Sequence, residues 1–322
     1  MKKLLLAVAV STVAAGSVNA ATVYEKDGFT YKLNGDLQVQ LRQKIGDEER
    51  AHVDYDDLEL KNYVAYDLGN DLTAFGRLDF GFKKAAEGDQ DGSNLEEAFV
   101  GLKYGVTSFS FGKQNFATDE FGIEENYEVE DIDEDRFDGF ETDGEDTIRV
   151  DVELENVYIA ASHEMDARDG DGEFYDLFVG TELAGLELAA AFQQFNPFDI
   201  DDSVSTWGVS ASYDFGIVTL AADYSVSDWS KDDDQIIGEW ADEDMTQYNV
   251  AAVFAVASTT DVAVGMGNKD SDAAGYEDIT EWYANVTYKF PQAKNVSVFA
   301  EIADSDVDEH DMGMLAGLRV KF

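Results

Sequence analysis

Residues that could perform enzymatic or metal chemistry are few in this chain. The three histidines, His52, His163 and His310, are widely separated, and there is no cysteine. These counts exclude disulfides, cysteine nucleophiles and cysteine-bound zinc, and they leave little for a histidine-based metal site. His163 precedes Glu164, but a catalytic histidine–acid pair also needs a placed nucleophile. We therefore predict a protein that is not an enzyme and needs no cofactor, with a barrel hydrolase as the weaker alternative.

Two acidic segments have the composition of calcium-binding loops. Residues 89–92 (DQDG) and 169–173 (DGDGE) each place several acids close together, and calcium prefers carboxylate oxygens. Neither segment has the full spacing of a calcium-binding hand. We interpret both as acidic hairpin tips that could bind divalent cations weakly.

The acid excess constrains the partners. The chain has 69 Asp and Glu against 22 Lys and Arg, a formal net charge of −47. A protein that binds nucleic acid must meet phosphate with Lys and Arg, so nucleic acid is excluded as a partner. The composition is 44% hydrophobic and 12% aromatic, which is ordinary for folded proteins and argues against an acidic disordered chain. The acidic and apolar side chains must therefore be separated in space.

Residues 1–20 have the order of a cleavable secretory signal. Lys2 and Lys3 precede an apolar stretch, which ends in the segment 18–20 (VNA); basic, apolar and small residues in this order are typical of export signals. We expect residues 21–322 to form one exported domain. The sequence contains no run of 18 apolar residues, so no membrane-spanning helix is expected.

The remaining chain alternates between apolar and polar residues. Near its end, Leu318, Val320 and Phe322 alternate with Arg319 and Lys321, and a period of two predicts strands with one apolar and one wet face. About sixteen such segments occur, and the connections between them are alternately short and long. We place the segments at 29–43, 53–68, 72–84, 94–104, 106–114, 146–154, 157–165, 173–182, 186–195, 205–215, 217–227, 246–256, 260–268, 279–290, 295–303 and 312–322.

Two architectures fit this pattern. A soluble β-sandwich would bury the apolar faces against each other, whereas a transmembrane barrel turns them toward lipid and its polar faces toward a wet lumen. The even strand number, the alternation of short turns and long loops, and aromatic residues at strand ends such as Phe215 and Phe290 favour the barrel. Only a closed barrel satisfies every backbone hydrogen bond of a sheet inside a membrane. We predict an all-β, 16-stranded antiparallel transmembrane barrel.

Several segments resemble the general porins of Gram-negative outer membranes. The likeness is carried by 21–28 (ATVYEKDG), 71–76 (DLTAFG), 98–104 (AFVGLKY), 108–113 (SFSFGK) and the terminal Phe322. The resemblance implies a homotrimer of water-filled channels in the outer membrane, in contact with its lipid and lipopolysaccharide, that passes small hydrophilic solutes. It implies that Phe322 is presented to the assembly machinery. It also implies that the third extracellular loop folds inward as a constriction, and the longest non-strand segment, 115–145, occupies that loop's place.

The family pattern of constriction charges is altered in this sequence. In the family, basic residues on the barrel wall face acids on the inward loop. Counted without gaps from the matched segments, the basic wall positions fall on acids, namely Asp36, Glu59, Glu96 and Glu141. The loop candidates are Asp119, Glu120, Glu124 and Glu125. Basic residues that could rebuild part of the cluster are Lys61, Arg77, Arg42 and Lys113.

The acidic character of the constriction predicts which solutes the channel passes. A lumen lined by one sign of charge concentrates counter-ions and repels co-ions, so we predict a channel for small cations and small polar solutes. The alternative is a channel specific for sugars or oligosaccharides, which would need a ladder of aromatic rings on the lumen face. Only Tyr63, Tyr283 and Phe299 face inward in the expected register, which is few for such a ladder.

Overall fold

The computed structural model describes residues 21–47, 49–88, 94–123, 125–127, 129, 132, 134–165, 172–197, 203–229, 244–271 and 278–322. The expected signal segment, 1–20, lies outside these residues. The strands are β1 (Ala21–Lys26), β2 (Phe29–Gln43), β3 (His52–Gly69), β4 (Leu72–Gly81), β5 (Asn94–Tyr104), β6 (Thr107–Asn115), β7 (Asp143–Glu153), β8 (Val157–Glu164), β9 (Glu173–Leu183), β10 (Leu186–Asn196), β11 (Val204–Asp214), β12 (Val218–Trp229), β13 (Met245–Ala257), β14 (Thr260–Ser271), β15 (Ile279–Phe290), β16 (Ala293–Ser305) and β17 (Gly313–Lys321). Two short helical turns are α1 (Lys83–Ala86) and η1 (Ala117–Glu120). Within the described ranges, no helix is long and apolar enough to cross a membrane.

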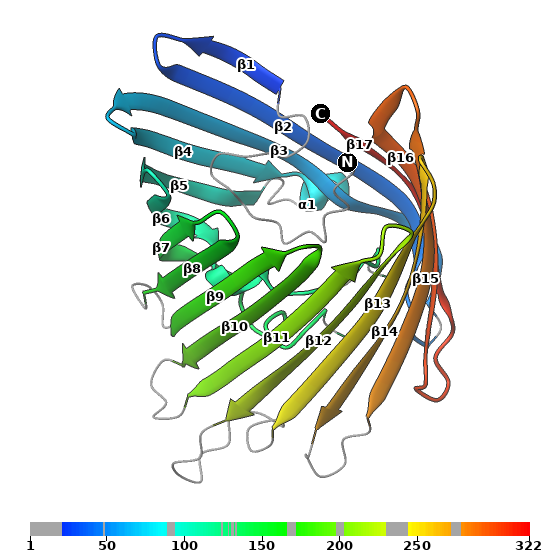
Figure 1. Ribbon diagram of the computed structural model, residues 1–322. Helices are drawn as coiled ribbons and strands as arrows, with labels where there is room; N and C mark the ends of the chain where they lie inside the picture. The colour runs from blue at the N-terminus through cyan, green and yellow to red at the C-terminus, as the bar shows by residue number, and fades with distance from the viewer. Residues whose placement is uncertain are drawn as a thin grey trace.

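Strands β2 to β17 close into a sixteen-stranded antiparallel barrel, which confirms the predicted fold class. Each strand pairs with the next in the chain, and β17 pairs with β2, where Lys321 lies opposite Asp36 (Figure 1). Tight turns support this order. In the turn between β9 and β10, Ala184 and Gly185 have φ of 54° and 83°, which are the positive angles of the turns that match the twist of a hairpin.

One additional strand precedes the barrel. β1 pairs with the first part of β2, where Ala21 lies opposite Leu33, whereas β17 pairs with the later part of β2. Because β3 covers the other edge of β2, β1 and β17 lie end to end along one edge. The terminal Phe322 exchanges two backbone hydrogen bonds with Gly35, of 2.8 and 3.0 Å, at this junction. Sequence periodicity missed β1 because the strand is short and merges with the following turn.

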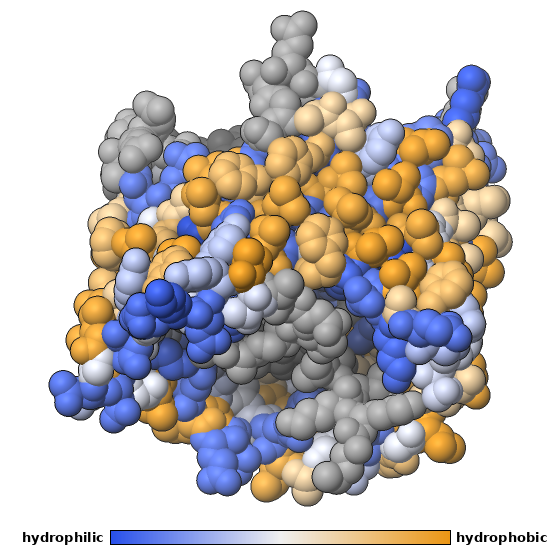
Figure 2. All heavy atoms as spheres, turned by 90° about the horizontal axis from the view of Figure 1, so that it is seen from above, coloured by the Kyte–Doolittle hydropathy of each residue, from blue (hydrophilic) through white to orange (hydrophobic). Residues whose placement is uncertain are grey.

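The barrel carries its apolar side chains on the outside. On β2, Leu37, Val39 and Leu41 are 42%, 38% and 54% exposed, whereas the intervening Gln38 and Gln40 are 0% and 2% exposed. Figure 2 shows apolar side chains side by side across a broad face, with hydrophilic ones gathered along its margins. A sandwich would show the reverse arrangement. The outer face is therefore built for hydrocarbon and the inner face for polar contacts.

The segment between β6 and β7, residues 116–142, lies inside the barrel, and we call its described residues the inner loop. Its apolar side chains pack on the inner wall: Phe137 packs in one cluster and Val129 in another, and Tyr127 stacks on Phe299 at 4.1 Å between ring centroids. Several wall residues in these clusters are small, which leaves room for the loop. These buried small residues are Ala160, Ala191, Ala221, Ala251, Ala263 and Ala303, on strands from β8 to β16.

Candidate functional site

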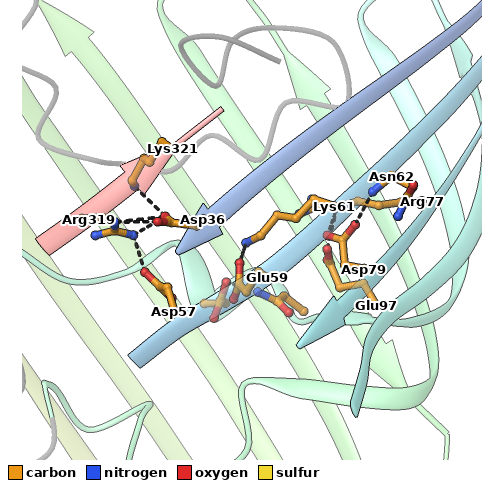
Figure 3. Close-up of polar contacts among 12 residues, drawn as sticks. Asp36, Asp57, Glu59, Lys61, Asn62, Arg77, Asp79, Glu97, Arg319 and Lys321 are labelled. Carbon is orange, nitrogen blue, oxygen red and sulfur yellow. Dashed lines mark hydrogen bonds and ion pairs between the residues drawn. The ribbon is translucent and has the colours of Figure 1, made fainter. Parts of the chain in front are cut away.

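Charged side chains gather on the inner wall formed by β17 and β2 to β5. A first group joins the two ends of the barrel sheet (Figure 3). Arg319 Nε lies 3.0 Å and Nη2 2.6 Å from the carboxylate oxygens of Asp36, and Lys321 Nζ lies 3.1 Å from the same carboxylate. Arg319 also pairs with Asp57 of β3. These residues meet because closure of the barrel places β17 beside β2.

A second group lies on β3, β4 and β5 (Figure 3). Lys61 pairs with Glu59, two residues away on the same face of β3. Arg77 Nε lies 2.6 Å from the nearest carboxylate oxygen of both Asp79 and Glu97. The expected residues Asp36, Glu59, Lys61 and Arg77 therefore lie on one stretch of wall, and both basic residues are held in ion pairs.

Two other expected basic residues also lie in ion pairs. Arg42 Nη2 lies 2.7 Å from the Asp54 carboxylate, and both side chains are buried. Lys113 Nζ lies 3.4 Å from the Asp143 carboxylate. Each of the four expected basic residues, Lys61, Arg77, Arg42 and Lys113, is thus beside at least one acid.

The expected loop acids have different environments. Asp119 is exposed on η1 and accepts a 2.5 Å hydrogen bond from Asn115, and it is close enough to Lys61 to interact with it electrostatically. Glu120 is buried and pairs with Arg149 at 2.7 Å, so its carboxylate points into the wall. Glu124 lies outside the described residues.

Two further expected acids also belong to the inner loop. Glu125 is partly buried, and this burial raises the pKa of its carboxyl to about 7, against a weaker opposing effect of Lys289. Glu141 is exposed and precedes β7, so it is a residue of the inner loop and not of a barrel strand. Its carbonyl accepts a 3.0 Å hydrogen bond from Gln193.

Arg149 of β7 fastens the beginning of the inner loop. Its Nη1 donates to the carbonyls of Asn115 and Phe116 at 3.1 and 2.8 Å. Its Nη2 donates to Glu120 at 2.7 Å and to the Tyr158 hydroxyl at 2.9 Å, and its Nε donates to Asp151 at 3.0 Å. All five N–H donors of the guanidinium are used, with the side chain buried, so this residue fixes the position of η1 against β7 and β8.

Acids on the far side of the barrel hold the rest of the loop. Both carboxylate oxygens of Glu301 accept from the single Tyr127 N–H, at 3.0 and 2.9 Å, and Glu281 accepts a 3.3 Å hydrogen bond from the Ile132 N–H. Sequence reasoning missed these acids as anchors. Their place on the inward face of a strand was visible in the alternation, but the loop backbone they meet lies 174 and 149 residues away in the chain.

The inward aromatic residues divide between the two walls. Tyr283 and Phe299 face inward as predicted, but the loop covers them: the Tyr283 hydroxyl accepts a 3.0 Å hydrogen bond from the Glu125 N–H, and Tyr127 stacks on Phe299. Tyr63 lies on the other wall beside Phe75, with ring centroids 6.4 Å apart. No continuous aromatic ladder is formed by the described lumen residues.

The buried charges are mostly negative. Among the described buried residues, eleven acids stand against three arginines, Arg42, Arg136 and Arg149. The acids are Asp36, Asp54, Asp79, Glu97, Glu120, Asp135, Asp151, Asp176, Asp223, Glu281 and Glu301. The acid excess of the whole sequence therefore extends into the interior of the barrel.

The described residues give no geometric support to the metal or histidine hypotheses. In the parts of the chain that the structure describes, no group of three or more His, Asp or Glu side chains is arranged to hold a metal ion. The acidic segments 89–92 and 169–171 lie outside the described residues. His163 stacks on Tyr175 at 4.4 Å between ring centroids and bonds the Phe174 carbonyl at 3.0 Å.

Comparison with known proteins identifies the family. The family model described as Gram-negative porin matches residues 6–310. The chain is similar to porin-like protein H of Photobacterium profundum, with 25% identity over all of both chains, and to outer membrane porin F of Salmonella typhimurium, with 26% identity over 96% of this chain and 94% of that protein.

Solved structures share the fold at lower identity. The trimer form of OmpT, an outer membrane protein of Vibrio cholerae, superposes with a TM-score of 0.78 at 19% identity, over 92% of this chain and all of that one. An anion-selective porin from Comamonas acidovorans superposes with a TM-score of 0.75 at 13% identity, over 91% of this chain and all of that one. The outward apolar face, the closed sixteen-stranded ring and the family match together lead to one conclusion: this chain belongs to the Gram-negative porin family and is a β-barrel of the outer membrane.

Proposed function

We propose that this porin forms a water-filled channel for passive diffusion of small hydrophilic solutes, with a preference for cations. The observation that carries the proposal is the sign of the interior charge, eleven buried acids against three buried arginines. Low-dielectric walls focus the field of such charges and raise the local concentration of counter-ions. Since an anion-selective porin has the same fold, the side chains and not the barrel decide which ions pass.

The inner loop and the opposite wall would together form the constriction. Asp36, Glu59, Glu96, Lys61 and Arg77 lie on the wall of β2 to β5, and the loop contributes Asp119, which is close to Lys61. We assign the narrowest part of the channel to this pairing of wall and loop. Because Lys61 and Arg77 are held beside acids, they would attract anions only weakly.

A sugar-specific channel is the second candidate, but the aromatic residues give it little support. Tyr63, Phe75 and Phe99 form one patch, in which Phe75 is buried, and the other inward rings support the loop. An enzymatic barrel is less well supported still, since His163 stacks on Tyr175 and bonds only a backbone carbonyl.

We further propose a homotrimer that contacts outer-membrane lipid and lipopolysaccharide. The support is the porin family itself and the trimer form of the Vibrio cholerae protein with the same fold. The mass of the native protein in mild detergent, measured by light scattering, tests this assembly; a monomer would contradict it.

The selectivity is tested by the reversal potential across a planar bilayer in a potassium chloride gradient. We expect large ohmic conductance steps and a potential of the sign for K⁺ preference. A potential near zero, or one of opposite sign, would refute cation preference and leave the family unchanged. An absence of ohmic steps from correctly folded protein would refute the open channel.

A further inference from the structure

One carboxylate of the charged wall differs from the others in its partners. Asp36 and Asp57 pair with Arg319, Glu59 pairs with Lys61, and Asp79 and Glu97 share Arg77. Glu96 is half-buried on the same wall, yet it has no hydrogen bond or ion pair with any described residue. Among the described residues, no base therefore neutralises its charge at contact distance.

The position of Glu96 depends on an irregularity in β5. Asp79 pairs with Glu97, but the next residue of β4, Phe80, pairs with Leu95, so the register omits Glu96. An extra residue of this kind is a β-bulge, which re-aims a side chain. Leu95 is exposed on the outer face and Glu97 is buried on the inner face. The bulge thus allows the two successive residues Glu96 and Glu97 to lie on the inner wall.

A glycine in the neighbouring strand provides the space for this carboxylate. Gly81 of β4 lies opposite Glu59 of β3. A Cβ atom at Gly81 would lie 2.6 Å from Glu96 Cδ and closer still to Glu96 Oε1. The carboxylate therefore occupies the volume that any other residue at position 81 would fill, beside Glu59, which interacts with it electrostatically.

From this arrangement we propose that Glu96 is the specificity-determining charge of the channel, and that Gly81 is the residue that positions it. The proposal rests on the proposed cation-preferring diffusion function. The field of a carboxylate without an ion-pair partner is not cancelled by a base at contact distance, whereas the field of a paired carboxylate is largely cancelled by its neighbour. The slot at Gly81 keeps this charge against the wall, so that it attracts cations without obstructing the lumen.

Neutralising the charge is the first test. One carboxylate about 5 Å from an ion in water raises the Boltzmann weight of K⁺ about fourfold and lowers that of Cl⁻ about fourfold. E96Q should therefore lower the K⁺ over Cl⁻ permeability ratio by up to about sixteenfold. The matched control is E155Q, which neutralises an exposed acid in the turn between β7 and β8 and should leave the ratio unchanged.

The positioning role is tested by a double-mutant cycle. G81A should push the flexible Glu96 carboxylate off the wall toward the lumen, which raises the K⁺ preference and lowers the single-channel conductance. In an E96A background, G81A should change neither the K⁺ preference nor the single-channel conductance. The control is G76A on the same strand, where a Cβ would meet its neighbours at 3.4 to 3.5 Å, an ordinary contact.

The outcomes separate this proposal from the general function. If the wild-type channel has no cation preference, the proposed function fails. If the wild type prefers cations but E96Q behaves like E155Q, or G81A has the same effect with and without Glu96, the assignment of Glu96 and Gly81 fails alone. Should G81A not fold, E96D keeps the charge on a side chain too short to reach the slot, and an E96D channel indistinguishable from wild type would overturn the positioning role.

Discussion

Replacing Arg149 by lysine should release the inner loop while the barrel stays closed. The guanidinium donates five hydrogen bonds, three of which go to the start of the loop: the carbonyls of Asn115 and Phe116, and the carboxylate of Glu120. Lysine has three donors on one nitrogen and lacks the planar fork. At least two of the five bonds are therefore lost.

The expected energy follows from the number of bonds. A hydrogen bond to a charged group contributes about 1.5 to 3 kcal/mol, so the loss of two bonds should weaken the whole Arg149 anchor, which includes the loop contacts, by about 3 to 6 kcal/mol. Lysine retains the positive charge beside Glu120 and Asp151, so no carboxylate is left wholly without a cation. The variant therefore tests the geometry of the anchor and not the presence of its charge.

Single-channel recording and thermal unfolding should be measured on the same preparation. Arg149→Lys should give frequent brief changes of conductance, because a loosened loop moves within the lumen. The matched control is Arg42→Lys, which alters an equally buried pair with Asp54 between β2 and β3. This control should lower the unfolding temperature without added current noise. If the current noise of Arg149→Lys equals that of Arg42→Lys, the guanidinium does not hold the loop.

Two further predictions concern the loop at neutral pH and the closure of the barrel. Burial raises the pKa of Glu125 from 4.5 to about 7, so the docked loop favours the protonated acid and should lose stability as the pH rises from about 4.5 through 7. Current noise should increase over this range in the wild type and stay constant in E125Q; a flat wild-type profile would refute the linkage. Gly35→Ala would place a Cβ 2.8 Å from Cε2 of the Phe322 ring and closer still to its Cζ and Cε1, so the yield of folded barrel, measured by electrophoretic mobility without boiling, should fall relative to G76A. An equal yield would show that the ring over Gly35 is dispensable.

The sequence predicted which segments form the strands of the barrel. Alternation predicted sixteen strands, and the barrel places them within a few residues of the expected ranges, with β2, β5 and β15 at the expected bounds. This signal is strong because the period of a strand is two, and because lipid on one side and water on the other demand opposite residue types. The acid excess likewise predicted an interior of one dominant sign.

The arrangement of the charges was decided by tertiary structure. Sequence counting placed acids on the wall, but it could not show that Arg319, near the end of the chain, would meet Asp36 near its start, because that contact exists only once the barrel closes. Nor could it show that Glu120 turns away from the lumen to meet Arg149, since both strand and loop must first be in place.

The bulge at Glu96 is the clearest feature that only the tertiary structure decided. Strict alternation from Glu97 would put Glu96 on the outer face, among side chains that contact lipid. The register shift between β4 and β5 and the missing side chain of Gly81 bring it inside. The sequence alone determined which strand faces contact lipid and which contact water, because the alternation of apolar and polar residues is local to each strand. Which charges neutralise each other depends on neighbours far away in the chain, and only the closed barrel brings those neighbours together.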